Sequence, residues 1–441
     1  METNIEPTSG LTESLLAVNQ LSYLMPPSIG IASSVRHAME FSQMNSYVIG
    51  GNGGSSTLVY DLQSGSSFID PAVSYFVFPV SHNSADVKMG FGSGSVANIL
   101  QSVTVRSRTA REICRVENFN LITKYNDLIQ NNNDRLTTIM KSQGYSPIGA
   151  EYGDAVPSTG KVFILPMATI PCFCPIGSKL LMPQLMEGLR IEFRFEASVV
   201  AFTPQEKKGA TPANFTYTVT RPYAHYCRYD LADAFQRQIA MMAARSGLRL
   251  LHKEYFHTIT ATTTNVLTTD IKKAASKALN CIIIERLVAN TTGSNADCFA
   301  STPNDIMTYQ GQIGSIYYPN APITIQDPTE AGNYESYYYA MYAASALDKA
   351  LNPSITLEQW TGSSGAAFAS NKVTYNNNFI MFNLNSSNVS QLVGMTLNNS
   401  RAFLLQLTTN NGSGGAAVRF DAFLSHLRAT TVFTSNVTVL D

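Results

Sequence analysis

The stretch that most constrains the fold is residues 189–201, in which apolar and polar side chains alternate almost without interruption. The apolar series is Leu189, Ile191, Phe193, Phe195, Ala197, Val199 and Ala201, and the polar series is Arg190, Glu192, Arg194, Glu196 and Ser198. Successive side chains of an extended chain point to opposite sides, so this pattern predicts a half-buried β-strand. A shift of one residue would bury four charges, which fixes the register strongly.

Length and composition predict two domains with large cores. The chain has 441 residues, whereas a single hydrophobic core stops growing at about 250–300 residues. Its 22 Phe and 21 Tyr supply ample apolar volume. Charged residues make up only 14%, against about 25% in typical soluble domains. This low charge suits a protein whose surface lies largely against other subunits.

The charge distribution argues against nucleic-acid binding and secretion. Because the net charge is −1, no overall attraction to nucleic acid is expected. The residues before Arg36, the first basic one, carry only acidic charges, on Glu2, Glu6 and Glu13. We therefore expect neither a basic arm nor a secretory signal, which needs a positively charged start. The apolar stretch 162–176 contains three prolines, so no membrane-spanning helix is expected.

The strand pattern divides the chain into two similar parts. A polar, proline-flanked stretch at 204–214 separates them and marks the predicted domain boundary. The predicted parts are an N-terminal segment at 1–55, a first domain at 56–207, and a second domain at 208–441 with a long insertion at about 290–375.

A few helices are expected among the strands. Helical spacing or capping residues predict them near 11–18, 121–129, 230–247 and 270–279. The tyrosine-rich stretch 334–351, which ends before Pro353, is predicted to form another. Strands and helices do not alternate as in parallel βαβ proteins, and each half offers six to eight strands. The sequence therefore predicts an all-β protein of two antiparallel eight-stranded jelly rolls, with a few short helices in long loops.

Catalytic signatures are absent from the sequence. It contains no GxSxG elbow, phosphate-binding loop or HExxH motif. Cys172 and Cys174 would share one face of an extended segment and could suit a soft metal, but no second pair completes a tetrahedral site. Buried, reduced thiols are the favoured interpretation. We predict no enzyme activity, no cofactor and no catalytic, cofactor-binding or metal-binding residues.

Three polar or aromatic groups have two interpretations each. His252 and Glu254 share a strand face with His257 opposite, which permits a proton relay, although an interface or surface pair is favoured. Among Arg106, Arg108, Arg111 and Arg115, acidic residues intervene, so ion pairs between subunits are favoured over nucleic-acid binding. The tyrosines of 337–342 could stack on bases or sugars, but a helix covering a loop core is favoured.

Three stretches of the first half resemble a known family. They are TLVYDLQSGSSFIDPAVSYFVFPV at 57–80, GSVANILQSVTVRSRTAREICRVENFNLITKYNDL at 94–128, and MEGLRIEFRFEASVVAF at 186–202. The first two resemble the opening of the first roll in double-jelly-roll major capsid proteins of Polinton-like viruses, virophages and related eukaryotic DNA viruses. The third resembles its closing strand. The second half agrees with the family in its general plan.

The resemblance implies a structural function. Members of this family form homotrimers with a pseudo-hexagonal outline, which tile icosahedral shells beside neighbouring capsomers, penton proteins and minor capsid proteins. Many such shells enclose an internal membrane. The expected location is the virion, assembled inside the host cell.

Two alternatives remain open from the sequence. The chain could be a single-jelly-roll coat protein of a small RNA virus with a protruding second domain, or a glycan-binding β-sandwich protein. A fold in the second half unlike that of the first would favour the coat protein. The long loops and the tyrosine-rich helix would suit glycan binding.

Overall fold

The structure is a computed structural model, and strands dominate it. The described residues are 32–51, 56–62, 67–84, 89–92, 94–107, 110–130, 138–145, 156–173, 181, 189–204, 214–245, 247–264, 266–288, 298–299, 301, 306–324, 334–348, 355, 360, 378–384, 395–398, 402–409, 417–432 and 437–440. The helix expected near 11–18 lies outside these residues.

Two antiparallel sheets form the first sandwich. Sheet A consists of β1 (Ala32–Phe41), β12 (Tyr223–Leu231), β4 (Phe68–His82), β11 (Tyr217–Thr220) and β2 (Ser46–Ile49), with β8 (Lys161–Pro166) also paired to β4. Sheet B consists of β3 (Thr57–Leu62), β9 (Leu189–Phe195), β6 (Leu100–Arg106) and β7 (Glu112–Glu117). A small third sheet, sheet C, pairs β5 (Met89–Phe91) with β10 (Phe202–Pro204).

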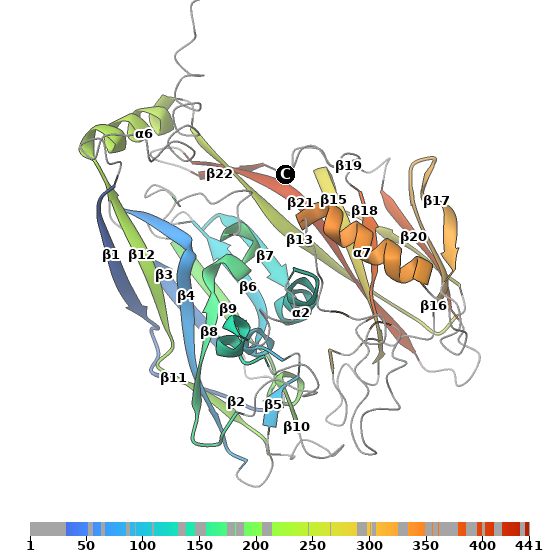
Figure 1. Ribbon diagram of the computed structural model, residues 1–441, viewed down its shortest axis with the longest axis horizontal. Helices are drawn as coiled ribbons and strands as arrows, with labels where there is room; N and C mark the ends of the chain where they lie inside the picture. The colour runs from blue at the N-terminus through green and yellow to red at the C-terminus, as the bar shows by residue number, and fades with distance from the viewer. Residues whose placement is uncertain are drawn as a thin grey trace, which may run out of the picture.

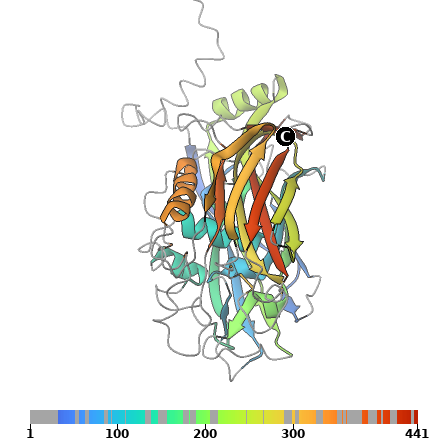
Figure 2. The same cartoon turned by 90° about the vertical axis from the view of Figure 1, so that its right-hand side faces the viewer.

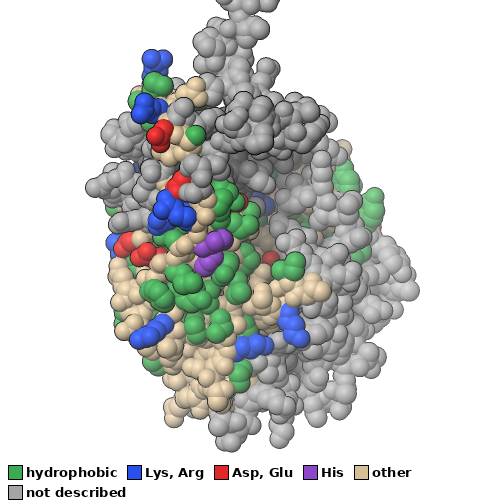
Figure 3. Space-filling view, turned by 60° about the vertical axis from the view of Figure 1, so that its left-hand side comes forward, with side chains coloured by type: hydrophobic (Ala, Val, Ile, Leu, Met, Phe, Trp, Pro, Cys, Tyr) green, Lys and Arg blue, Asp and Glu red, His purple; other side chains and the backbone are tan. Residues whose placement is uncertain are grey.

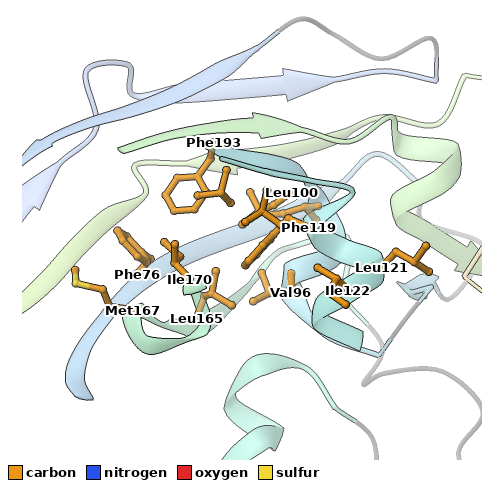
Figure 4. Packing of buried hydrophobic residues seen from close by; sticks show 14 of the residues in the cluster. Phe76, Val96, Leu100, Phe119, Leu121, Ile122, Leu165, Met167, Ile170 and Phe193 are labelled. Carbon is orange, nitrogen blue, oxygen red and sulfur yellow. The ribbon is translucent and has the colours of Figure 1, made fainter. Parts of the chain in front are cut away.

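The alternating stretch forms β9, with its apolar face in the core as predicted. Leu189, Ile191 and Phe193 are fully buried. The Phe193 ring lies edge-on to that of Phe76 on sheet A, with ring centroids 5.0 Å apart. Figure 4 shows Phe193 facing this core beside residues of β6, β8 and the helices. The strand is shorter than predicted, because a short helix, α5 (Ser198–Ala201), follows it.

The second sandwich repeats this plan with two further sheets (Figure 2). Sheet D consists of β13 (Leu248–Thr262), β21 (Val418–Val432), β15 (Ala275–Leu287) and β18 (Ile380–Asn383), with β19 (Met395–Leu397) paired to β15 and β22 (Val437–Leu440) paired to β21. Sheet E consists of β14 (Val266–Ile271), β20 (Phe403–Thr409), β16 (Ile306–Ile313) and β17 (Ile316–Thr324). Tyr309 on β16, Phe382 on β18 and Phe403 on β20 meet in its core.

Three of the predicted helices are present. They are α2 (Phe119–Gln130), α6 (Asp233–Arg245) and α7 (Tyr334–Asp348). Short 3-10 helices also occur: η3 (Val96–Ile99), η4 (Ile139–Gln143), η5 (Met167–Thr169) and η6 (Pro171–Phe173). Gly247, with φ of 70°, follows α6 and marks its end.

The helix predicted at 270–279 is wrong. This stretch ends β14 and begins β15, which pairs with β21 and β19. Its Lys and Ala residues favour helix locally, but cross-strand pairing in the sheet overrides that preference.

Two strands that the predicted boundary at 207/208 assigns to the second domain belong to sheet A of the first sandwich. β11 and β12 follow that boundary in sequence, yet they pair with β4 in sheet A. The expectation of a first domain that closes at 207 is therefore wrong for these strands. The predicted N-terminal segment 1–55 likewise supplies β1 and β2 to the same sheet. The predicted insertion 290–375 contributes β16 and β17 to sheet E.

The two sandwiches lie side by side, with α2, β7 and η6 of the first packed towards β13 of the second (Figure 1). Tyr125 on α2 lies against Phe379 of the second sandwich, with ring centroids 5.8 Å apart. The Lys124 ammonium donates to the Phe299 carbonyl at 2.8 Å. One hydrophobic cluster runs through this junction, which makes the two sandwiches one packed body.

Among the described helices, none has the length and apolarity needed to cross a membrane.

Candidate assembly surfaces

The outward face of sheet A carries an unusual number of exposed apolar side chains. On β1, Met39 is 58% exposed and Phe41 is 60% exposed. The exposed hydrophobic residues of the sheet and its adjoining turn are Val35, Met39, Phe41, Met44, Val48, Val73 and Val162. We call this set, with His37, Tyr75, Tyr223 and His225, the sheet A surface. Clusters of this kind mark contacts with other molecules more often than isolated exposed residues do.

An aromatic stack lies at the centre of the sheet A surface. The His37 and His225 rings are stacked with centroids 5.1 Å apart, and Tyr75 stacks on His225 at 4.7 Å. Strand register produces the stack. His225 on β12 lies opposite Met39 on β1 and opposite Tyr75 on β4, and His37 lies two residues from Met39 on the same face of β1. Figure 3 shows histidine side chains surrounded by hydrophobic ones on this face.

The charged residues of β1 and β12 have partners within the chain. Arg36 on β1 forms an ion pair with Asp230 on β12. Asp230 also accepts a hydrogen bond from the Ser67 hydroxyl at 2.5 Å. The Arg228 guanidinium lies over the Tyr226 ring, 5.0 Å from its centroid. Arg36, Arg228 and Asp230 alternate with His37 and His225 along β1 and β12, so they point to the opposite side of sheet A from the stack.

A second apolar surface lies on β17 and α7. Ile316 and Tyr317 on β17 are 54% and 41% exposed, and Tyr338 on α7 is 71% exposed. Tyr338 and Tyr342 stack with ring centroids 6.4 Å apart. We call these four residues the β17–α7 surface. β17 forms one edge of sheet E and β1 forms one edge of sheet A, and these strands lie at opposite ends of the molecule in Figure 1.

A buried ionic network lies at the junction of the sandwiches. Asp421 on β21 accepts hydrogen bonds from Arg286 at 2.6 Å and from Arg419 at 2.8 Å, and its other contact is His257 at 2.9 Å. Burial alone would raise the pKa of Asp421. The His257 hydrogen bond and the two guanidinium charges more than offset it and hold that pKa well below its usual range.

Glu254 connects sheet D to sheet B. It lies 3.1 Å from Arg428 and accepts a hydrogen bond from the Arg115 backbone N–H at 3.2 Å. Arg428 also donates to the Ile113 carbonyl on β7 at 3.3 Å. Burial raises the pKa of Glu254, but the His426 hydrogen bond and the Arg428 charge lower it overall. The proton relay considered for His252, Glu254 and His257 is not favoured, since these side chains serve structural contacts.

The other sequence candidates also have structural partners. Arg115 donates to Glu117 at 2.6 Å, and Arg106 lies 3.5 Å from Glu192. Both arginines thus have acidic partners within the same chain, and ion pairs between subunits stay a prediction. Arg108 lies outside the described residues. Arg190 lies 3.1 Å from Glu192 on the exposed face of β9, as predicted for its charged series.

Of the cysteine and tyrosine candidates, the structure describes Cys172 and the tyrosines of 337–342. Cys172 is buried, which raises the pKa of its thiol, whereas Cys174 lies outside the described residues. Within the described part of the chain, no group of three or more His, Cys, Asp or Glu side chains could hold a metal. The Tyr337 hydroxyl donates to the Ile355 carbonyl at 2.9 Å, so this tyrosine packs inward as favoured. Tyr338 points outward instead.

The sequence does not predict the sheet A surface, because its residues are far apart in the chain. His37 and His225 meet only through the pairing of β1 with β12. The one local signal is in residues 35–41, where Val, His, Met and Phe alternate with smaller or charged residues.

Solved structures match the chain over nearly its whole length. The PBCV-1 virus capsid superposes with a TM-score of 0.57 at 11% identity, covering 95% of this chain and 99% of that chain. The Faustovirus major capsid protein gives 0.55 at 10% identity, covering 95% and 96%. The chain is a double jelly roll. The mavirus major capsid protein shares this double jelly roll, with a TM-score of 0.52 at 9% identity and coverages of 95% and 94%.

Neither a family model nor a curated protein matches the sequence. At these identities the structural likeness establishes the double jelly-roll fold. It excludes the alternative of one jelly roll followed by a different protruding domain, because the second half is itself a two-sheet sandwich.

Proposed function

We propose that this chain is a non-enzymatic major capsid protein of an icosahedral virus, located in the virion. The observation that carries the proposal is the match of both sandwiches, together, to capsid structures over 95% of the chain. Fold alone does not assign function. The buried ion pairs at the junction and the exposed apolar surfaces add support, since they suit a rigid building block that binds copies of itself.

The subunit forms homotrimers with a six-sided outline. Two unlike apolar surfaces at opposite ends of one chain suit a head-to-tail contact, which closes into a ring when the rotation per subunit allows it. Three copies of a two-sandwich chain would place six sandwiches around the ring. The sheet A surface and the β17–α7 surface are the contact faces in this proposal.

Further partners follow from the same function. Neighbouring trimers, penton proteins and minor capsid proteins would contact the outside of the trimer, and an internal membrane is compatible with such a shell. We propose no sequence-specific nucleic-acid contact, in line with the net charge of −1. The division of the chain into two rolls is proposed to fall at α6, between β12 and β13.

Negative-stain electron microscopy of the purified chain tests this function. We expect particles with a six-sided outline and a central three-fold axis at neutral pH. Phe41→Asp, which adds a charge to the sheet A surface, should give smaller, single particles. Thr268→Asp adds the same charge on exposed β14, away from both surfaces, and should keep the six-sided outline. Single particles for every variant and for the wild type would contradict the proposal.

A further inference from the structure

Two cysteine thiols meet in the first sandwich although they are far apart in the sequence. Cys114 lies on β7 and Cys172 on η6, and η6 packs against β7. The two side chains are hydrogen-bonded to each other, and both are buried in the same hydrophobic cluster. A disulfide needs two cysteines whose backbones lie close together and whose side chains point towards each other. This pair meets both conditions without a rearrangement of the fold.

The contact between two thiols distinguishes this pair from Cys281. Cys281 is also fully buried, in the core of the second sandwich, and burial is the sole cause of the raised pKa of its thiol. For Cys172, the neighbouring Cys114 side chain raises the pKa further, beyond the effect of burial. Cys281 therefore provides an internal control for any reaction that needs two adjacent sulfur atoms.

The pair lies beside the junction of the two sandwiches. The Glu254 carboxylate is close enough to Cys172 to raise the pKa of its thiol. Glu254 also accepts a hydrogen bond from the backbone N–H of Arg115, the residue after Cys114. Both β7 and η6 pack against β13 of the second sandwich. A covalent bond between Cys114 and Cys172 would join two of the elements on which the second sandwich rests.

Burial determines how such a bond behaves. Because burial raises the pKa of Cys172, little thiolate is present there, and oxidation of the folded chain is slow. The same burial keeps a thiol reductant away from the finished bond, since exchange requires access to one of its sulfur atoms. The site therefore suits a bond that forms once and persists.

We propose that Cys114 and Cys172 form a disulfide when the folded chain meets a small peroxide. One thiolate sulfur attacks a hydrogen peroxide oxygen, the O–O bond breaks, and the hydroxide that leaves takes up the proton of this thiol as water. The resulting sulfenic acid is attacked by the second thiolate, the S–O bond breaks, and a second water forms in the same way. Two thiols are oxidised to one disulfide, and the peroxide is reduced to water.

Formation of the bond does not depend on the proposed function, but the role that we give it does. A virion that leaves its host cell passes from reducing to oxidising surroundings, in which disulfides persist. The bond would then fix β7 to η6 beneath the junction and help to hold the two rolls in place after assembly.

Peptide mapping of the full chain tests the inference. The chain is treated with hydrogen peroxide, its remaining thiols are alkylated in denaturant, and it is digested with trypsin without reductant. Trypsin releases Cys114 in residues 112–115 and Cys172 in residues 162–179. We expect these two peptides to be linked, the link to disappear on reduction, and Cys281 to be recovered alkylated.

Three variants locate the bond. Cys114→Ser and Cys172→Ser should each abolish the linked peptide. Because residues 162–179 also contain Cys174, Cys174→Ser is the matched control and should keep the link. The fluorescence of Trp360, the single tryptophan of the chain and a buried one, shows that each variant is folded.

The stability of the oxidised chain provides a second measurement. Closing a long loop should raise the midpoint of thermal unfolding by about 5 °C relative to the reduced chain. Dithiothreitol should reduce the bond at least about tenfold faster in urea than in native buffer, because unfolding exposes the sulfur atoms.

The outcomes separate the inference from the capsid function. A folded wild type whose Cys114 and Cys172 stay alkylated after peroxide treatment overturns the inference and leaves the capsid function standing. A link that persists in Cys172→Ser, or disappears in Cys174→Ser, overturns it as well. A chain that forms the bond but stays monomeric under all conditions contradicts the proposed function and leaves the bond standing.

Discussion

Glu254 and Arg428 form an ion pair on adjacent strands of sheet D, and both also bind the backbone of β7 in the other sandwich. A charged pair that is shared with a neighbouring sheet fixes the position of one sandwich against the other. For a shell-forming subunit this matters, because the relative placement of the two rolls sets the shape of the capsomer.

Glu254→Gln should loosen this junction. The change leaves Arg428 and His426 without their carboxylate in a buried site, and removing one partner of a buried pair costs about 3–5 kcal/mol. Urea unfolding measures the loss. Glu192→Gln, in a more exposed pair with Arg190, should cost under about 1 kcal/mol. Equal losses in the two variants would contradict the role of Glu254.

His252 should make the fold sensitive to mild acid. Burial lowers the pKa of His252 to about 4, while its ring contacts the Thr430 hydroxyl at 2.9 Å. In the unfolded chain the pKa of a histidine is about 6.5, so as the pH falls the unfolded chain binds a proton at this position before the folded chain does. The contribution of His252 to stability is therefore complete above about pH 6.5 and falls towards pH 4, by about 3 kcal/mol in total.

Urea unfolding of the wild type and His252→Gln at pH 7.5 and 4.5 checks this. The wild type should lose more stability than the variant on acidification, because glutamine does not titrate. An identical pH dependence for both proteins would show that His252 is not responsible.

Phe193→Asp should abolish soluble expression. Phe193 is fully buried against Phe76, Phe78 and Tyr60, so the new carboxylate would have neither water nor a partner. The cost is several kcal/mol. Arg194→Gln changes the exposed face of the same strand and should preserve the yield. Wild-type yield and melting temperature for Phe193→Asp would mean that the strand faces the other way.

Gly311→Ala should destabilise the second sandwich. A Cβ atom at Gly311 on β16 would lie 2.6 Å from the Phe403 ring, closer than atoms can approach without movement. Overpacking of this kind costs about 1–3 kcal/mol. Gly50→Ala is a matched control, since its nearest neighbour would be 4.0 Å away. Thermal unfolding measures both, and Phe403→Leu should partly restore the Gly311→Ala variant.

Those parts of the fold that depend on local patterns could be predicted from the sequence. The alternation of 189–195 places its faces correctly, and the spacing of apolar residues locates α2 and α6. The failures have a shared physical cause. β15 has a helix-favouring start, and β11 and β12 follow a loop that is typical of a boundary. In both cases pairing with strands that are distant in the chain decides the outcome.

The candidate surface could not be predicted for the same reason. His225 is 188 positions from His37, and only the register of β12 against β1 and β4 brings the rings together. In a strand that mixes apolar and charged residues, the sequence also does not show which apolar side chains are exposed. Phe41 would be expected to face a core, yet it is 60% exposed beside the ring of Tyr223.

Sedimentation equilibrium of the purified wild-type chain at pH 7.5 tests the central claim most directly. The account predicts one dominant species of about 144 kDa, three times the 48.0 kDa of a single chain. A stable species of 48.0 kDa at all protein concentrations would contradict it.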